Sequence, residues 1–246
     1  MSLLQLEGIS KKFGQVVVAK EISFQLEAGD AVGIVGPNGA GKTSLFAMIS
    51  GDIKPDAGHM SFEGHDLGHL SASKRARAGI GRTYQVPRPF EHMTVFENTL
   101  LAAQQGARAR GQKAFDVAFA SLERTGLGDF ANLSAGSLTL LRRKRLELAR
   151  ALATNPRVVL LDEIAGGLTD MEVNELTVII RTLRDEGIAV VWIEHVVRAL
   201  VSTVDRLLCL AGGSIVADGD PQAVLTSEEV RAVYLGGKVL NQAPLS

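Results

Sequence analysis

One motif restricts the fold of this chain more than any other stretch. It is the run Gly36-Pro37-Asn38-Gly39-Ala40-Gly41-Lys42-Thr43. The run matches the pattern G-x-x-x-x-G-K-[ST], and it lies between an apolar segment, 31–35, and a helical pattern, 44–50. Glycines let successive backbone N–H groups curl around an anion, and the N-terminus of the following helix adds partial positive charge. The motif therefore predicts a phosphate-binding loop between a buried strand and a helix.

The polar residues of this loop indicate which phosphate compound it binds. Lys42 is expected to reach the β- and γ-phosphates of a nucleoside triphosphate, and the Thr43 hydroxyl is expected to hold Mg²⁺. The alternative is a glycine-rich turn with a chance lysine, which the flanking strand and helix patterns disfavour. We therefore expect the nucleotide to contact the loop and the residue after it. The expected contact residues are Gly36, Pro37, Asn38, Gly39, Ala40, Gly41, Lys42, Thr43 and Ser44.

Length and charge narrow the class of protein. The chain has 246 residues, enough for one large domain or two small ones with a substantial core. Its formal net charge is −1, and aromatic residues make up only 5% of it. Nucleic-acid binders usually carry a basic excess, and none is present here. We expect no nucleic acid among the partners.

The single cysteine and the lengths of the apolar stretches indicate in which cellular compartment the protein works. Cys209 lies in the apolar run 207–210 and is expected to be a buried, inert thiol. One cysteine cannot form a disulfide within the chain, which fits a reducing compartment. No apolar stretch approaches the roughly 18 residues that span a bilayer, and residues 1–7 lack a signal-peptide pattern. We expect a cytoplasmic protein; if it works at a membrane, separate chains must span the bilayer.

Segments near the N-terminus have the alternation of sheet strands. Residues 4–9 and 22–27 alternate apolar and polar side chains, so both are predicted to be half-buried strands of an antiparallel sheet. A short strand is also predicted at 60–63, after a turn. Phe13 precedes a glycine between the first two strands. Its ring could stack on a base, or it could anchor the loop or the core.

The middle of the chain changes to a helical pattern. Residues 80–85 are predicted to form a strand that ends on Gln85, and Pro87 and Pro89 then stop regular structure. From about 94 to 132 the pattern is helical, with a polar interruption at 104–113. No strand pattern intrudes there, which indicates a helical insert in an otherwise α/β chain.

Another helix is predicted at 138–154. Leu141, Leu148, Ala149 and Leu152 share one face of it. The same helix contains the basic run 142–145, which could indicate nucleic-acid binding. On a chain of balanced charge, such a cluster is more often a solvated face or a local anion contact, and we prefer that interpretation.

Two later strands carry polar residues at their ends. The apolar run 158–161 is typical of a strand buried on both faces, and Asp162 and Glu163 follow it directly. A second buried strand, 189–194, is followed by His195. Because α/β folds bind ligands at the carboxyl ends of their parallel strands, we expect these side chains to lie at one binding edge.

In their order along the chain, these motifs resemble the ATPase subunit of an ATP-binding cassette (ABC) transporter. Residues 36–43 match the Walker A motif, Gln85 matches the Q-loop, 158–162 match Walker B, Glu163 matches the catalytic base and His195 matches the switch histidine. The resemblance covers nearly the whole chain. It implies an α/β fold: a P-loop NTPase core with a mostly parallel sheet, an N-terminal antiparallel β subdomain and a helical subdomain insert.

The resemblance also implies a domain organisation and a role for each motif. Residues 1–246 would be a single ABC ATPase domain, with 87–138 as the helical subdomain and 1–86 and 139–246 as the RecA-like core plus the antiparallel β subdomain. Glu163 would orient and deprotonate the attacking water, His195 would contact the γ-phosphate, and Gln85 would act with them. Mg²⁺ would take oxygens from Thr43, Gln85 and Asp162. Phe13 falls where the family places its adenine-stacking aromatic residue.

One departure from the family pattern lies in the signature loop, Leu-Ser-Gly-Gly-Gln, which binds the nucleotide of the opposite subunit. Counting back from Arg145 places this loop at Leu138, Thr139, Leu140 and Leu141, so leucines stand where both glycines belong. A similar run at 133–137 begins five residues too early. We expect the site that this loop completes in a partner to be weakened or differently built.

A second departure lies in the D-loop, at Leu168, Thr169 and Asp170. The family usually has Asp or Asn where Thr169 stands. A threonine can still hydrogen-bond across a dimer interface, but it cannot carry the charge of an aspartate.

Within the family, the chain is most similar to subunits of the branched-chain amino acid transport type. The segments that carry this similarity are 81–85, 93–98, 145–152 and 233–236. We expect an ATP-hydrolysing subunit that powers solute transport, with uptake of branched-chain or related amino acids. The alternatives are a regulatory half-cassette with weak hydrolysis and a soluble, non-transport ABC ATPase. The expected partners are a second ATPase subunit, transmembrane permease subunits and a solute-binding protein, at the inner face of the cell membrane.

Overall fold

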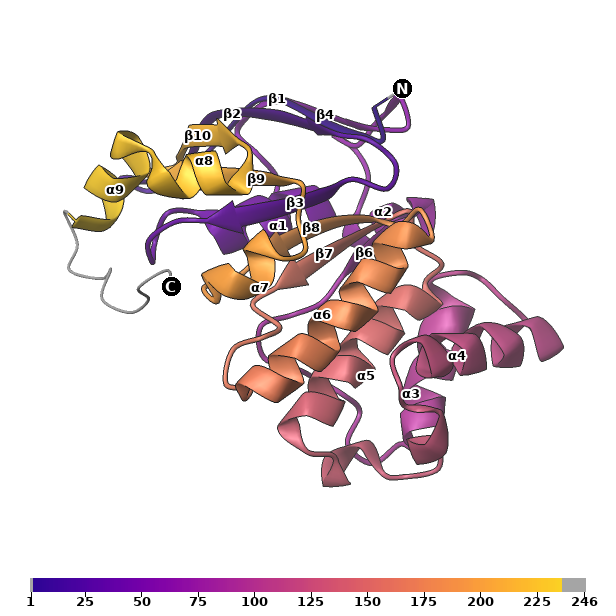
Figure 1. Cartoon of the computed structure of the whole chain (residues 1–246). Helices are drawn as coiled ribbons and strands as arrows, with labels where there is room; N and C mark the ends of the chain where they lie inside the picture. Colours follow the sequence, from indigo (N-terminus) through magenta and orange to yellow (C-terminus); the bar gives the residue numbers. More distant parts are fainter. Residues whose placement is uncertain (1, 236–246) are drawn as a thin grey trace.

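Two β-sheets form the centre of the chain. The computed structural model describes residues 2–235 (Figure 1). The smaller sheet has four strands in the order β2-β1-β4-β5, and its neighbouring strands pair antiparallel. These strands are β1 (Leu4–Phe13), β2 (Val16–Leu26), β4 (Ala57–Phe62) and β5 (His65–Asp66). This is the predicted antiparallel N-terminal layer.

The larger sheet has six strands in the order β10-β9-β3-β8-β7-β6. All neighbours in it pair parallel except β10, which runs antiparallel to β9. Its strands are β3 (Ala31–Val35), β6 (Ile80–Arg82), β7 (Val158–Asp162), β8 (Ala189–Ile193), β9 (Arg206–Ala211) and β10 (Ser214–Gly219). The mostly parallel sheet confirms the predicted α/β class.

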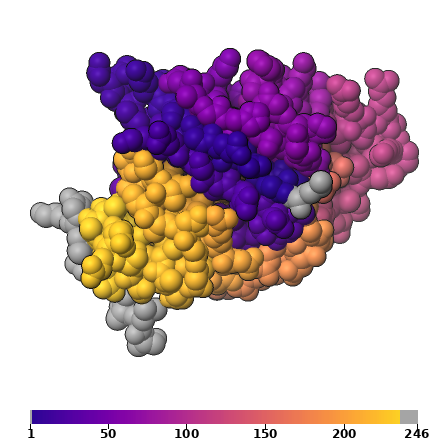
Figure 2. All heavy atoms as spheres, turned by 90° about the horizontal axis from the view of Figure 1, so that it is seen from above, coloured from indigo at the N-terminus to yellow at the C-terminus, as the bar shows by residue number. Residues whose placement is uncertain are grey.

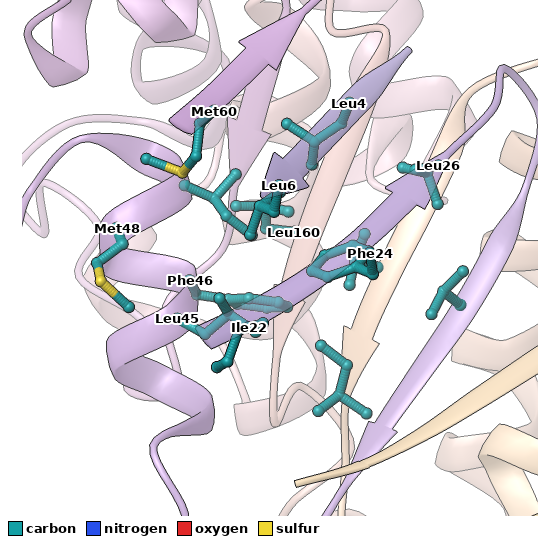
Figure 3. Close-up of a cluster of buried hydrophobic side chains, with 14 of the residues drawn as sticks. Leu4, Leu6, Ile22, Phe24, Leu26, Leu45, Phe46, Met48, Met60 and Leu160 are labelled. Atoms are coloured by element: carbon teal, nitrogen blue, oxygen red, sulfur yellow. The ribbon is translucent and has the colours of Figure 1, made fainter. Parts of the chain in front are cut away.

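The central strands of the larger sheet are buried on both faces, which explains their continuous apolar sequence. Val32 and Ile34 pack on one face, whereas Ala31 and Val35 pack on the other. The first face meets helix α1 (Lys42–Ser50) and the antiparallel sheet in one hydrophobic core. Figure 3 shows this core, to which both sheets and α1 contribute. Among its labelled residues are Leu6, Phe24, Phe46 and Leu160.

Eight further helices follow α1 in the described residues. They are α2 (Ala72–Ala78), α3 (Val95–Gln105), α4 (Gln112–Arg124), α5 (Leu140–Ala153), α6 (Asp170–Asp185), α7 (Val197–Val201), α8 (Pro221–Thr226) and α9 (Glu228–Leu235), with short 3-10 turns at Gly128–Phe130 and Ala135–Ser137. Of the segment 233–236 that the sequence singled out, Gly236 lies outside the described residues. None of the helices formed by residues 2–235 has the length and apolar character that a membrane crossing requires.

Helices α3 and α4 lie apart from both sheets and pack on each other and on α5 (Figure 1). Val95, Leu122, Leu146 and Ala149 belong to the small core of this group. Helix α3 begins with a capping box at Thr94, because the Thr94 hydroxyl and the side chain of the third helical residue satisfy each other's backbone N–H. The polar interruption predicted at 104–113 contains the loop between α3 and α4.

The N-terminal sheet and the C-terminal strands lie side by side. Figure 2 shows the indigo N-terminal segment against the orange and yellow C-terminal one. The Lys20 N–H donates to the Gly213 carbonyl oxygen at 2.8 Å, which joins β2 to the turn between β9 and β10. This hydrogen bond connects the antiparallel sheet to the β9–β10 edge of the larger sheet.

Two predicted boundaries were wrong. The strand expected to end on Gln85 ends at Arg82, although β7 continues for two residues beyond Leu160, the partner of Arg82. Beyond that pair, the Asp162 N–H donates to the Thr83 hydroxyl at 3.2 Å, so a side chain takes the place of a backbone partner. The first hairpin is longer than predicted: β1 continues to Phe13, which pairs with Val16 across a two-residue turn. The alternation that defines a half-buried strand fades where both faces of the hairpin become exposed.

Candidate active site

The glycine-rich loop after β3 takes a shape that side chains would prevent. Gly36 and Gly41 have φ values of 150° and 99°. A Cβ atom on Gly36 would lie 2.1 Å from the Leu210 carbonyl oxygen, and one on Gly41 would lie 2.0 Å from the Val18 carbonyl oxygen. The backbone of the loop therefore packs closely against β9 and β2. Helix α1 begins directly after Gly41, which is its N-cap.

Lys42 stands in the first turn of α1 and points back into this loop. Its Nζ donates to the carbonyl oxygens of Gly36 at 2.7 Å and Pro37 at 3.1 Å, and the residue is 5% exposed. Burial lowers the pKa of Lys42, whereas the carboxylates of Glu163 and Asp162 raise it. A cation is thus held at the loop, and Thr43, the next residue, is exposed to solvent.

Asp162 ends β7 and is 1% exposed. Its Oδ2 lies 3.3 Å from Nη2 of Arg82, and within residues 2–235 its Oδ1 is buried without a hydrogen-bond partner. Burial raises the pKa of Asp162, and the Arg82 cation lowers it in part. A buried carboxylate oxygen that accepts no hydrogen bond fits a hard cation such as Mg²⁺, whose preferred protein ligands are oxygens. The donor set predicted for the metal therefore fits at Asp162.

Three predicted residues from distant parts of the chain meet at Glu163. Its Oε2 accepts from Nε2 of Gln85 at 2.5 Å, and its Oε1 lies 2.8 Å from Nε2 of His195. The side chain of Glu163 is 16% exposed and that of His195 is 45% exposed, so solvent reaches the group. Strand register explains the meeting: Asp162 pairs with Ile193, which places the residues after β7 beside those after β8.

Two residues that hold this group in place are not in the predicted set. Lys144 Nζ donates to the Glu163 carbonyl oxygen at 3.2 Å. Glu194 accepts from the N–H of Ala165 at 2.8 Å and from the N–H of His195 at 2.9 Å. Both are buried charged residues, 4% and 1% exposed respectively. A sequence signal existed for Lys144 alone, since it lies on the apolar face of its helix.

For the basic run at 142–145 we expected a solvated face or a local anion contact: the solvated face was wrong, whereas Arg145 does make a local anion contact, with Glu175. Lys144 is buried, and the other three side chains make contacts within the chain. Arg142 lies over the Phe130 ring, Arg143 donates to backbone carbonyls, and Arg145 pairs with Glu175. The run therefore ties α5 to its surroundings instead of presenting a cationic surface.

Phe13 stands apart from the hydrogen-bonded group around Glu163. It is 48% exposed, and the Lys11 ammonium lies 5.3 Å from the centroid of its ring. The exposure argues against a role in the core. Strand β2, which pairs with the strand of Phe13, also packs on the phosphate-loop glycine Gly41 through Val18.

The signature segment lies at the start of α5. Thr139 is the N-cap of this helix, Leu140 and Leu141 form its first residues, and Leu138 is buried just before it. The competing run at 133–137 lies before the helix, where the Ser134 hydroxyl donates to the carbonyl oxygen of Glu91 at 2.8 Å. The segment counted back from Arg145 thus lies at the N-terminus of α5, whereas the run at 133–137 precedes this helix.

The D-loop segment lies at the start of α6. Thr169 caps this helix in a capping box with Glu172, and the two side chains approach to 2.8 Å. Asp170 pairs with Arg198 at 2.7 Å, and Leu168 packs on the core. The Thr169 hydroxyl, a group that can hydrogen-bond across a dimer interface, thus contacts Glu172 within the chain.

Comparison with known proteins decides the family. The family model described as ABC transporter matches residues 19–166, more than half of the chain. The chain belongs to the ABC transporter family. The resemblance drawn from its motifs is therefore confirmed, and with it the assignment as an ATPase, since members of this family hydrolyse ATP.

Relatives of this ABC protein show how specific the match is. The branched-chain amino acid transport ATP-binding protein BraF of Pseudomonas aeruginosa is 33% identical, over 95% of this chain and 98% of BraF. The lipopolysaccharide export ATP-binding protein LptB of Acidithiobacillus ferridurans is 36% identical, over 95% of this chain and 97% of LptB. The ADP conformation of the ABC-transporter cassette MJ1267 superposes with a TM-score of 0.86 at 30% identity, over 96% of this chain and 99% of that one. This ABC protein is thus the ATPase subunit of a transporter, but identity alone does not separate the two kinds of solute.

Proposed function

We propose that this chain hydrolyses ATP at the site formed by the phosphate loop, Asp162, Glu163 and His195. The observation that carries the proposal is the position of the Glu163 carboxylate, which is held by Gln85 and His195 and directly follows the buried carboxylate of Asp162. The loop N–H groups and Lys42 would bind the phosphates, and Phe13 would stack on the adenine.

Glu163 has the features of a general base in this mechanism. Its carboxylate is partly exposed, so a water molecule can reach it, and two neighbours fix its direction. When ATP binds, the γ-phosphate would draw the side chains of Gln85 and His195 toward itself. The freed carboxylate of Glu163 would then accept a proton from the attacking water. Mg²⁺ held by Asp162, Thr43 and Gln85 would neutralise charge that develops on the phosphate oxygens.

Glu163→Gln tests the hydrolytic mechanism. The amide keeps a hydrogen-bonding oxygen but cannot accept a proton, so we expect turnover to fall by about a hundredfold or more while ATP binding persists. Steady-state phosphate release and equilibrium binding of a fluorescent ATP analogue separate the two effects. Glu229→Gln, at an exposed carboxylate on α9, is a matched control. Undiminished turnover in Glu163→Gln would remove this residue from its role.

For the solute, we propose uptake of branched-chain or related amino acids. The support is the relation to BraF together with the segments 81–85, 93–98 and 145–152. Residues 87–138, with α3 and α4, would be the helical subdomain that faces the permease, and 1–86 with 139–246 would form the rest of a single ATPase domain. The complete assembly would contain a second ATPase subunit, permease subunits and a solute-binding protein at the inner face of the cell membrane.

Lipopolysaccharide export is a second candidate, because LptB is at least as similar in sequence as BraF. Reconstitution of the chain with its co-purifying membrane subunits in lipid vesicles separates the two. Amino acid uptake predicts that leucine, isoleucine or valine, presented with the solute-binding protein, stimulates ATP turnover. Stimulation by lipopolysaccharide alone would favour export. No response of turnover to the membrane subunits at all would favour a regulatory or non-transport role.

A further inference from the structure

Lys144 is a buried cation to which the proposed mechanism assigns no role. It lies in the second turn of α5, and it is 4% exposed. Its Nζ donates to the backbone carbonyl oxygen of Glu163 at 3.2 Å. Removing an ammonium group from water is costly unless it is paired and hydrogen-bonded. The contact between α5 and Glu163 is therefore a specific one and not a chance surface interaction.

Glu194 completes this arrangement from the other side. It is 1% exposed, its Oε2 accepts from the N–H of Ala165, and its Oε1 accepts from the N–H of His195. Burial lowers the pKa of Lys144, and the negative charges of Glu194 and Glu163 raise it. One buried cation and one buried anion thus contact the backbone immediately around Glu163 and His195.

The backbone at Glu163 needs such support. Its φ of 48° lies in the left-handed region, which residues other than glycine rarely adopt. A residue stays in that conformation only where contacts with the surrounding structure hold it there. The carbonyl group of Glu163 and the N–H of Ala165 are the backbone groups that Lys144 and Glu194 hold.

We propose that Lys144 and Glu194 are positioning residues that clasp the backbone of Glu163 and set the direction of its carboxylate from helix α5. This inference rests on the proposed role of Glu163 as general base. Helix α5 also carries Thr139 at its N-terminus, the hydroxyl of the signature segment. In a dimer, the signature segment would contact the nucleotide in the partner's site. A shift of α5 that followed this contact would also move the Glu163 carbonyl group. The two nucleotide sites would be coupled in this way.

Two substitutions of Lys144 test the clasp in the full chain, purified with its membrane subunits. Lys144→Met keeps a long unbranched side chain and removes the charged donor, whereas Lys144→Arg keeps a charged donor. Lys113→Met, at an exposed position of α4, is the matched control. The measurements are kcat and KM for ATP, and amide hydrogen exchange over residues 163–166 and over α1.

We expect Lys144→Met to lower kcat by about ten- to a hundredfold, because a small displacement of the base is costly, and to leave KM nearly unchanged. Exchange should become faster over 163–166 but not over α1. Lys144→Arg should recover most of kcat, and Lys113→Met should behave as the unmodified chain.

Unchanged kcat and unchanged exchange at 163–166 in Lys144→Met would overturn the proposal. Equal losses in Lys144→Met and Lys144→Arg, with faster exchange throughout the chain, would also overturn it, since they would show a general packing role. The two proposals fail in different ways. If Glu163 is not the base, Glu163→Gln keeps its turnover, whereas the exchange measurement still reports whether the clasp exists.

Discussion

Replacing Arg82 by methionine should destabilise the chain, because this guanidinium joins two carboxylates beside the phosphate loop. Its Nη1 lies 2.8 Å from Oδ2 of Asp52, and its Nη2 lies 3.3 Å from Oδ2 of Asp162. The side chains of Arg82 and Asp162 are 8% and 2% exposed. In Arg82→Met, the buried carboxylate of Asp162 would lose the cation that contacts it, and the Lys42 ammonium would act on it only at longer range.

The expected loss follows from the cost of an unpaired buried charge. Removing one partner of a buried ion pair costs about 3–5 kcal/mol, and the 3.3 Å separation favours the lower end, about 3 kcal/mol. In a chain of this size, 1 kcal/mol shifts Tm by about 2–4 °C, so Tm should fall by about 6–12 °C.

The loss of stability in Arg82→Met should also depend on pH. The pKa of Asp162 is raised by burial above the ordinary value of 3.8, and Arg82 opposes that rise, so the variant has a higher pKa still. A carboxyl group whose pKa is raised in the folded state favours folding while it is protonated, below the unfolded pKa. That contribution is lost as pH rises through the folded pKa. The Tm difference between the variant and the unmodified chain should therefore be small in acid and should grow toward neutral pH.

Calorimetry of the metal-free chain over a range of pH measures the difference in Tm between Arg82→Met and the unmodified chain. Arg157→Met provides the control. Nη1 of Arg157 lies 2.8 Å from Oε1 of Glu63, but these side chains are 56% and 40% exposed, so their pair should contribute at most about 1 kcal/mol. Added Mg²⁺ should restore part of the Tm of Arg82→Met. Equal Tm shifts in the two variants, or a shift independent of pH, would refute the reasoning from burial.

Three further predictions concern other parts of the chain. Gly41→Ala should abolish binding of a fluorescent ATP analogue, because φ is 99° there and the new Cβ would lie 2.0 Å from the Val18 carbonyl oxygen; binding within about tenfold of the unmodified chain would contradict this. Thr139→Ala should lower the ATPase rate by about ten- to a hundredfold, and Ser134→Ala should change it little; a loss in Ser134→Ala alone would show that the signature register is wrong. Burial raises the pKa of the Cys209 thiol to about 11, so iodoacetamide at pH 8 should label it only after denaturation, and rapid labelling of the folded chain would contradict its burial.

The sequence could predict the parallel sheet and part of the site because each of its central strands is an apolar run that ends in polar residues. Val158–Asp162 and Ala189–Ile193 are buried throughout, and a strand of that composition fits between two covered faces. Parallel strands present their carboxyl ends at one edge, so the sequence alone predicts that Glu163 and His195 meet. Their 2.8 Å contact follows from the pairing of Asp162 with Ile193.

Strand ends were less predictable, because they depend on the partner strand as well as on local sequence. Residues 80–85 have strand character throughout, yet β6 ends at Arg82. β7 continues to Asp162, but the Asp162 N–H donates to the Thr83 hydroxyl at 3.2 Å and not to a backbone carbonyl of β6. Gln85 consequently reaches Glu163 from a loop, through its side chain, and not from the end of a strand.

Buried charges around the site were missed for a related reason, although one of them left a trace in the sequence. Lys144 lies three residues after Leu141 and four before Leu148, so it falls on the apolar face of α5. A charge on such a face is too costly unless a partner is buried with it, and its presence therefore predicts an anion or a carbonyl group in the core. The helix cannot identify that partner, because the Glu163 carbonyl comes from the turn after β7 and Glu194 from the end of β8. Charged residues at apolar positions of a helix that precedes Walker B are thus the places where a sequence points to the supports of the catalytic group.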